Sequence, residues 1–167
     1  MTPTKQTKHR FNPIPEDLQP QLVREVARYR VGLIRETADS EPPPRCSNPQ
    51  ALADWVLAEL ADRPQEHMLA VYLDTRNRVI GWTVADVGTM NRAAVEPRTI
   101  LQTGLLLNAA GVAIAHNHPS GDPSPSAEDL SFTRRMAEAG EIVGVRLVDH
   151  LVIGDGNWVS LRQRGAL

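Results

Sequence analysis

The hydrophobic and polar positions of the chain change period several times, and each change predicts a different element. Over residues 27–35 apolar side chains alternate with arginine and glycine, which is typical of a strand with one solvated face. Residues 68–74 and 78–87 predict two further strands, and the Thr-Arg-Asn segment 75–77 between them predicts a hairpin turn. The run Gly-Val-Ala-Ile-Ala at 111–115 is apolar throughout, as expected for a central strand buried on both faces.

Three segments have the periodicity of amphipathic helices. The first begins at Ser47-Asn48-Pro49-Gln50, with a polar cap and a proline in the first turn, and closes at Arg63-Pro64. A second helix is expected from Pro97 to about Ala109, and a third from Ala127 to Ala139, with Gly140 as its stop. The positions expected to face the core are Leu52, Trp55, Val56 and Leu60 in the first helix and Ile100, Leu101, Gly104 and Leu105 in the second.

The remaining segments complete an α/β domain. Residues 145–153 and 158–161 predict the last strands, and the proline-rich stretch 37–45 predicts a loop. Residues 1–25 are polar and proline-rich, so we expect a tail ahead of a domain that spans residues 26–167. A single mixed β-sheet flanked by two to three helices accounts for this order of elements.

The composition narrows the class of protein. Apolar residues make up 41% of the 167 residues, enough for a core, but aromatic residues make up 4%, too few for a platform that stacks single-stranded nucleic acid. The formal net charge of −2 does not support tight non-specific binding to nucleic acid. The single cysteine, Cys46, excludes an intrachain disulfide, and we expect its thiol to be inert. With no apolar run long enough for a membrane span or a signal peptide, we expect a cytoplasmic protein.

The segment from Ala115 to Asp129 carries the candidate chemistry. His116 and His118 follow the buried strand, and side chains two residues apart on an extended chain point to the same side, so both imidazoles can face one metal ion. Asp129 lies in the first turn of the next expected helix and can add a carboxylate. Two histidines and one aspartate leave one position of a tetrahedral zinc site open for water, as in catalytic zinc sites.

Other roles for these residues fit the same pattern. A His-x-His sequence occurs by chance and can simply end a strand, and Ser126-x-x-Asp129 has the spacing of a helix capping box. Zinc is the preferred ion, but iron and manganese also accept such ligands. The spacing alone leaves the metal site and the structural roles open.

These residues also carry a resemblance to a known family. The stretch His116-Asn117-His118-Pro119-Ser120-Gly121-Asp122-Pro123, followed by Pro125-Ser126 and Glu128-Asp129, resembles the signature of the RadC family, a bacterial branch of the JAB/MPN (JAMM) metalloprotease superfamily. The superfamily pattern is His-x-His, seven residues, Ser, two residues and Asp, and the chain fits it without a gap. The resemblance covers roughly residues 50–167, with shorter matches at Pro97-Arg98, Leu107-Asn108-Ala109-Ala110 and Asp149-His150.

The resemblance implies an architecture, a cofactor and a reaction. It implies the JAB/MPN fold, which is cytidine-deaminase-like, and one Zn²⁺ per chain held by His116, His118 and Asp129. The implied reaction is hydrolysis of a peptide or isopeptide bond in a peptide or protein substrate by metal-activated water. Glu66 is implied as the general base and then the acid, with Glu96 as the competing candidate.

Two further positions take roles from the resemblance. Ser126 is implied as the hydrogen-bond donor to a developing oxyanion. Asp149-His150 is expected either to orient a ligand or to form a buried hydrogen-bonded pair. His67 adjoins Glu66, but the alternation of a strand would turn it to the opposite face.

Two other functions remain open at this point. Only about 26 residues precede the first expected strand, so we expect the short form of the family, without the helix-hairpin-helix module that many RadC members carry. An inactive MPN scaffold is one alternative, although the intact ligand set argues against it. The other is a DNA-repair-associated accessory protein with a mainly structural metal, whose only basis is a set of arginines: Arg76, Arg78, Arg92, Arg98, Arg134, Arg135, Arg162 and Arg164.

Overall fold

A five-stranded sheet with three helices makes up the part of the chain that the computed structural model describes, residues 46, 48–60, 63–88 and 96–167. The expected tail, the strand at 27–35 and the loop at 37–45 lie outside these ranges. In chain order the elements are α2 (Pro49–Leu60), β1 (Glu66–Leu73), β2 (Val79–Gly88), α3 (Pro97–Leu106), β3 (Gly111–Asn117), α4 (Ala127–Val143), β4 (Arg146–Ile153) and β5 (Trp158–Ser160).

The sheet is mixed, as the sequence predicts. Its strand order is β2-β1-β3-β4-β5, with β1 antiparallel to both β2 and β3. β3 and β4 run parallel, and α4 makes the crossover between them, whereas β5 returns antiparallel beside β4. The expected α/β class and the single mixed sheet are therefore confirmed.

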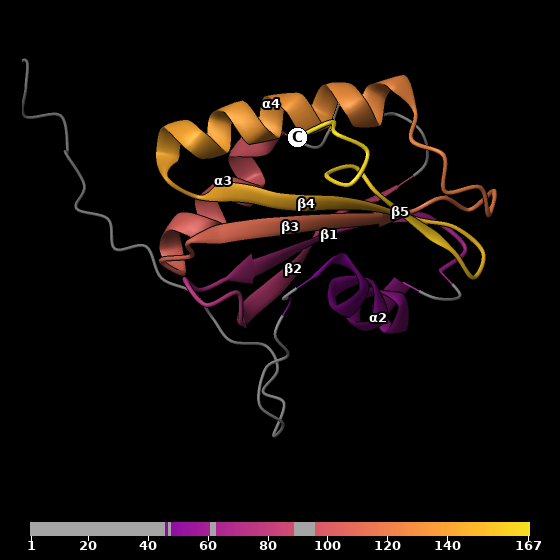
Figure 1. Ribbon diagram of the computed structural model, residues 1–167, viewed down its shortest axis with the longest axis horizontal. Coiled ribbons are helices and arrows are strands. Elements are labelled where there is room, and N and C mark those ends of the chain that lie inside the picture. Colours follow the sequence, from indigo (N-terminus) through magenta and orange to yellow (C-terminus); the bar gives the residue numbers. More distant parts are fainter. Residues whose placement is uncertain (1–45, 47, 61–62, 89–95) are drawn as a thin grey trace, which may run out of the picture. The chain divides into compact units, whose positions relative to one another are not determined.

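The helices divide between the two faces of the sheet. Figure 1 shows α2 on one face and α3 and α4 on the other. Because side chains alternate along a strand, Val71 and Leu73 of β1 join the core beneath α2, while Ala70 and Tyr72 join the core beneath α3 and α4. β3 is buried at every position, which confirms the central strand expected from its apolar run and extends it through His116 and Asn117.

Two details of the second expected helix are wrong. Leu105 does not face the core: 52% of its surface is exposed, while Ile100, Leu101 and Gly104 of the same helix are buried. α3 ends at Leu106 rather than near Ala109, and its last turn closes through Leu107. The periodicity marks the apolar stripe but not its edge, and Leu105 lies just outside the stripe.

Gly140 is not the end of α4. The helix continues to Val143 and ends at Gly144, which has a left-handed φ of 78° that favours glycine. Gly140 lies inside the helix because the chain passes close to it: a Cβ at this position would lie 2.6 Å from the carbonyl oxygen of Val145. Among the described residues, no helix is both long enough and apolar enough to cross a membrane.

Candidate metal centre

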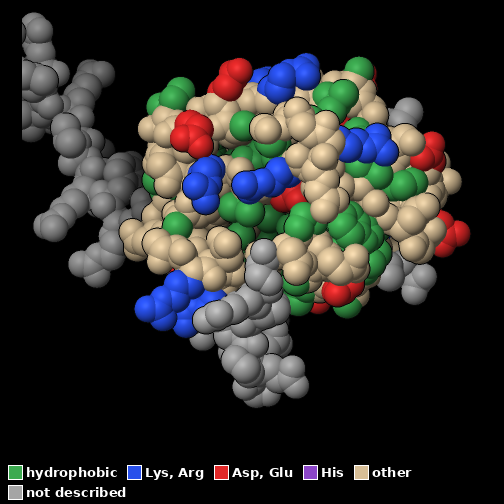
Figure 2. Space-filling model, viewed as in Figure 1, with side chains coloured by type: hydrophobic (Ala, Val, Ile, Leu, Met, Phe, Trp, Pro, Cys, Tyr) green, Lys and Arg blue, Asp and Glu red, His purple; other side chains and the backbone are tan. Residues whose placement is uncertain are grey.

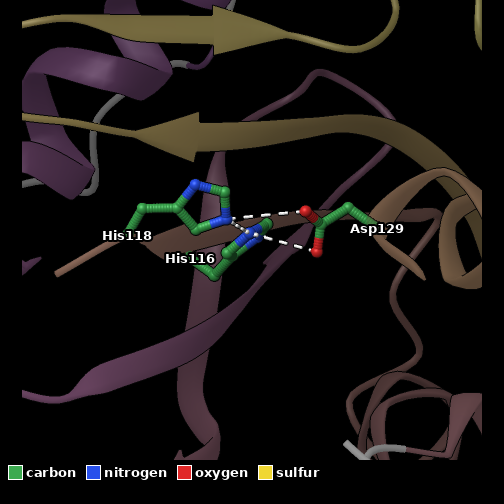
Figure 3. A group of neighbouring side chains, drawn as sticks. All are labelled: His116, His118 and Asp129. Atoms are coloured by element: carbon green, nitrogen blue, oxygen red, sulfur yellow. Dashed lines mark hydrogen bonds and ion pairs between the residues drawn. The ribbon is translucent and has the colours of Figure 1, made fainter. Parts of the chain in front are cut away.

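Three side chains converge where β3 ends and α4 begins. Figure 3 shows His116, His118 and Asp129 with their polar atoms turned toward one another. The two Nε2 atoms of the histidines are 3.0 Å apart. Asp129 places Oδ1 at 3.3 Å from Nε2 of His116 and Oδ2 at 3.5 Å from Nε2 of His118. The three residues expected as metal ligands are thus brought together in the structure.

The turn after β3 is fixed by the neighbouring β4–β5 connection. The main-chain N–H of His118 donates to the carbonyl of Ile153 at 2.8 Å, and Asp155 donates to the carbonyl of Gly121 at 2.9 Å. Gly121 has a φ of 80°, and Gly154 packs so closely that a Cβ there would contact the carbonyl of Gly121. His118 therefore leaves the strand in a defined direction rather than on a free loop.

Asp129 is held by the first turn of α4. Ser126 caps the helix, and the capping box is complete: its Oγ accepts from the N–H of Asp129, while its own N–H donates to Oδ2 of Asp129 at 2.7 Å. The hydroxyl of Ser126 also donates to Oδ2 at 2.5 Å. Oδ2 is thus engaged by Ser126, and Oδ1 is the oxygen next to His116. The capping box is therefore present, and the same residue also lies where it could hold a metal ion beside His116 and His118.

The surroundings favour the charged form of Asp129. Burial alone would raise the pKa of its carboxyl, but the imidazole of His116 and the hydroxyl and main-chain N–H of Ser126 outweigh burial and hold that pKa well below its ordinary value. A carboxylate that stays ionised at all ordinary pH values is suited to bind a cation.

The donor set fits a tetrahedral metal ion. Ligand atoms bound to zinc at ordinary distances lie about 3.3 Å from one another in a tetrahedral site. The three separations here are 3.0, 3.3 and 3.5 Å. Nδ1 of His118 lies 2.8 Å from the carbonyl oxygen of Asp122, and because a carbonyl only accepts, Nδ1 is the donor and Nε2 is the ring atom that faces the site. His116 is fully buried, but the side chain of His118 is 12% exposed, so solvent reaches the site at this ligand.

The register of the sheet places Glu66 on the same side as His116. Met68 pairs with His116 across β1 and β3, and Glu66, the first residue of β1, lies two residues before Met68. Side chains two residues apart share a face, so Glu66 projects from the face that carries the histidine. His67 projects from the opposite face, as expected.

Asn117 links β3 to the segment around Glu66. Its side-chain oxygen accepts from the N–H of His67 at 2.8 Å, and its Nδ2 lies within hydrogen-bonding distance of the carbonyls of Arg63 and Gln65. These contacts bracket Glu66 on both sides. Glu96, the competing candidate, instead forms an exposed ion pair of 2.6 Å with Arg135 at the start of α3.

His150 and Thr133 extend the site into the core. Nδ1 of His116 lies 2.8 Å from Nε2 of His150, and Nδ1 of His150 lies 2.6 Å from Oγ1 of Thr133. Burial is the main cause that lowers the pKa of His150 well below its ordinary value, so its ring is neutral. Asp149 points away from this group and accepts hydrogen bonds from the hydroxyl of Ser160. Asp149 and His150 are thus both buried and hydrogen-bonded, but to different partners, and His150 is the one that contacts a residue of the His-His-Asp group.

Thr133 and Asn117 were not among the residues that the sequence pattern placed at the site. Nothing in the sequence around Thr133 indicates its contact, because Thr133 lies on α4 and its partner His150 lies on β4, and the two meet only in the folded protein. Asn117 had a signal: it stands between two residues that share a face, so a strand must turn it the other way, toward the core beneath α2. A buried amide there needs partners, and the chain before β1 supplies them.

Basic side chains do not gather into one patch on the face that Figure 2 presents, where blue and red side chains are interspersed. Two of the arginines considered as a nucleic-acid surface pair with carboxylates: Arg78 with Asp74 at 2.7 Å and Arg135 with Glu96. Arg92 lies outside the described residues.

Comparison with known proteins matches the family expected from the motif. Residues 46–166 match the sequence profile of the RadC-like JAB domain family. The chain belongs to this family. A UPF0758 protein from Shouchella clausii is 43% identical over 122 residues, which cover 73% of this chain and 53% of that protein. The UPF0758 protein from Methanosarcina mazei is 37% identical over 130 residues, or 78% and 57% of the two chains.

The matched regions cover only part of the length of these relatives. A UPF0758 protein from Desulfitobacterium hafniense is 36% identical over 160 residues, which cover 87% of this chain and 70% of that protein. The chain spans about half the length of the first curated relatives that it matches. The family match includes β1, β3 and α4, so the whole His-His-Asp group lies within the RadC-like JAB domain.

Proposed function

We propose that this RadC-like JAB domain is a zinc-dependent metallohydrolase of the JAMM type that cleaves a peptide or isopeptide bond. The observation that carries the proposal is the convergence of two imidazole nitrogens and one carboxylate within 3.5 Å of one another. Three protein ligands leave a fourth position for water or substrate, which distinguishes catalytic zinc from structural zinc.

The metal would supply the Lewis acid that makes a water molecule acidic enough to attack a carbonyl carbon near neutral pH. His116, His118 and Asp129 would hold it, and Glu66 would accept the proton of the attacking water and pass it to the leaving amine. The shared face of Glu66 and His116, with Met68 between them in the register, supports this role. The peptide or protein substrate approaches from the side of His118, the most exposed of the three ligands.

Ser126 is proposed as a hydrogen-bond donor to the developing oxyanion. Its hydroxyl now donates to Oδ2 of Asp129, so it would first have to exchange that acceptor for the substrate oxygen. Its N–H keeps its own bond to Oδ2 of Asp129, which maintains the cap of α4 during such a rotation.

The experiment compares zinc-loaded protein with its Glu66→Gln variant on a library of proteome-derived peptides supplemented with lysine-branched isopeptides. New amino termini and released branches are counted by mass spectrometry, and a chelator-treated sample gives the background. Gln has the shape of Glu but cannot accept the proton, so the variant should bind zinc like wild type and lose cleavage. Absence of cleavage by the zinc-loaded wild type would overturn the proposed activity, and equal cleavage by both proteins would overturn the role of Glu66.

A further inference from the structure

We infer that β2 pairs with the β2 strand of a second copy of this chain, so that the two copies share one continuous sheet. β2 is an edge of the five-stranded sheet, and among the described residues its only strand partner is β1. The other side of β2 therefore offers main-chain N–H and C=O groups to a further strand. Such an assembly is independent of the proposed hydrolysis.

The two edges of the sheet differ in how they are protected. Edge strands commonly avoid association because they are short or because they carry lysine or proline. β5 is short, with three residues, and so offers little to a partner. β2 has ten residues with neither lysine nor proline among them, and Asp86 is its only charged residue. β2 is therefore the edge that can accept another strand.

β2 also carries apolar side chains that the fold leaves uncovered. Ile80, Val84 and Val87 are 39%, 46% and 50% exposed. They are three of the eight large hydrophobic residues that are exposed in the described part of the chain, so such residues are concentrated on this strand. Burial of these side chains against another apolar surface would favour association.

The sequence of β2 is complementary to itself when two copies run antiparallel. The stretch 81–84 pairs regularly with β1, between the two register shifts of that pairing, and Trp82 lies within it. A two-fold axis at Trp82 places Val84 opposite Ile80 of the partner subunit, and the symmetry repeats this pair on the other side of the axis. The exposed side chains of the two copies thus cover one another.

The same register brings opposite charges together. Asp86 lies opposite Arg78 of the partner subunit, and the side chain of Arg78 is 49% exposed. A register that set Asp86 opposite its own copy would instead place like charges side by side, which destabilises a strand pair. Charge therefore favours an axis at Trp82 over an axis near the end of the strand.

The core beneath α2 reaches this shared edge. Trp82 and Val84 pair with Val71 and Leu69 of β1, which belong to that core. Trp82 also packs edge-on against Trp55 of α2, with ring centroids 6.0 Å apart. A two-fold axis perpendicular to the sheet keeps the α2 helices of both copies on the same face. The apolar layer beneath α2 therefore continues from one copy to the other.

The test measures the mass of the full chain in solution by light scattering, at concentrations up to about 100 μM. Wild type should form a dimer. Val84→Lys places a charge at the shared edge and should weaken dimerisation by at least about 100-fold. Ile142→Lys makes the same kind of change on α4, where the side chain is 85% exposed, and should leave the dimer intact. A monomeric wild type would overturn the inference, and so would Val84→Lys protein that dimerises like wild type.

A cross-link tests the register. Residues four apart on one strand are separated by about 13 Å, so cysteines at positions 80 and 84 of one chain cannot bond to each other. In the inferred dimer each of them lies opposite the other position of the partner subunit. Oxidation of the Ile80→Cys, Val84→Cys double variant should therefore give a covalent dimer, and either substitution alone should give essentially none. A double variant that does not cross-link, or single variants that cross-link equally well, would overturn the axis at Trp82.

Discussion

The side-chain oxygen of Asn117 accepts a hydrogen bond of 2.8 Å from the main-chain N–H of His67, although 50 residues separate the two in the sequence. Asn117 stands between His116 and His118, so the strand turns it away from the metal centre and toward the start of β1. Three consecutive residues of β3 and its following turn thus serve two purposes. The histidines are directed toward Asp129, and the asparagine contacts the segment that carries Glu66.

Asn117→Ala should therefore destabilise the protein while leaving the zinc ligands in place. The change removes the partner of the His67 N–H and of the carbonyls of Arg63 and Gln65. We expect the free energy of unfolding to fall by about 2 kcal/mol, measured by urea denaturation. Gln102→Ala, an exposed change on α3, is the control and should stay within about 0.5 kcal/mol of wild type. Equal stability of Asn117→Ala and wild type would show that these bonds do not hold the segment.

Asp129 has two roles that substitution can separate. Asn at this position keeps an oxygen that can accept from the N–H of Ser126, but it removes the negative charge beside the histidines. We expect Asp129→Asn to lower the free energy of unfolding of the zinc-free protein by about 1 to 3 kcal/mol, because the surroundings that hold the pKa of Asp129 low stabilise its charged form. Zinc affinity, measured by chelator competition, should fall by more than about 100-fold, because loss of a ligand exceeds the effect of a supporting residue. A variant that retained wild-type affinity would exclude Asp129 as a ligand.

Long apolar runs and strand alternation allowed much of this fold to be predicted. The burial of β3, the hairpin of β1 and β2 and the common direction of His116 and His118 depend on neighbours in the sequence. Contacts between distant segments could not be predicted in this way. The chain passes close to Gly140 because Val145, the residue before β4, lies beside it, and Thr133 meets His150 because α4 packs against β4.

Gly140→Ala tests the close passage that the sequence did not reveal. Alanine is the better helix former by about 1 kcal/mol, so propensity alone predicts stabilisation within a helix. The added methyl group would meet the carbonyl of Val145 at 2.6 Å, and the backbone must shift to admit it. We expect the free energy of unfolding to fall by about 1 to 3 kcal/mol in urea denaturation. Glu141→Ala, next in the helix and exposed, should have little effect, and a stabilised Gly140→Ala would refute the contact.

The thiol of Cys46 should react slowly and with a steep dependence on pH. Burial raises the pKa of Cys46 to about 11, and only 6% of the residue is exposed. At pH 8 about 0.1% of the thiol is ionised, so alkylation by iodoacetamide should accelerate roughly tenfold per pH unit up to pH 10. Denatured protein is the control and should react fast already at pH 8. A fast, pH-insensitive reaction of the folded protein would contradict the raised pKa.

The same shift has a consequence for stability. The pKa of Cys46 lies above its ordinary value of 9.0 in the folded state, so between pH 9 and about 11 the unfolded chain releases a proton that the folded chain retains. Unfolding is therefore favoured as the pH rises through this range. The free energy of unfolding should therefore fall less between pH 8 and pH 10 for Cys46→Ala than for wild type, as measured by urea denaturation at the two pH values.

The most direct test of the central claim is the zinc content of the purified protein after zinc loading and removal of excess metal, determined by elemental analysis. Wild type should hold about one zinc ion per chain, and His118→Ala and Asp129→Ala should hold essentially none. His67→Ala, which removes a histidine from the opposite face of the sheet, should bind like wild type. Wild-type protein that takes up no zinc, or ligand variants that keep it, would contradict the assignment of His116, His118 and Asp129 as a metal site.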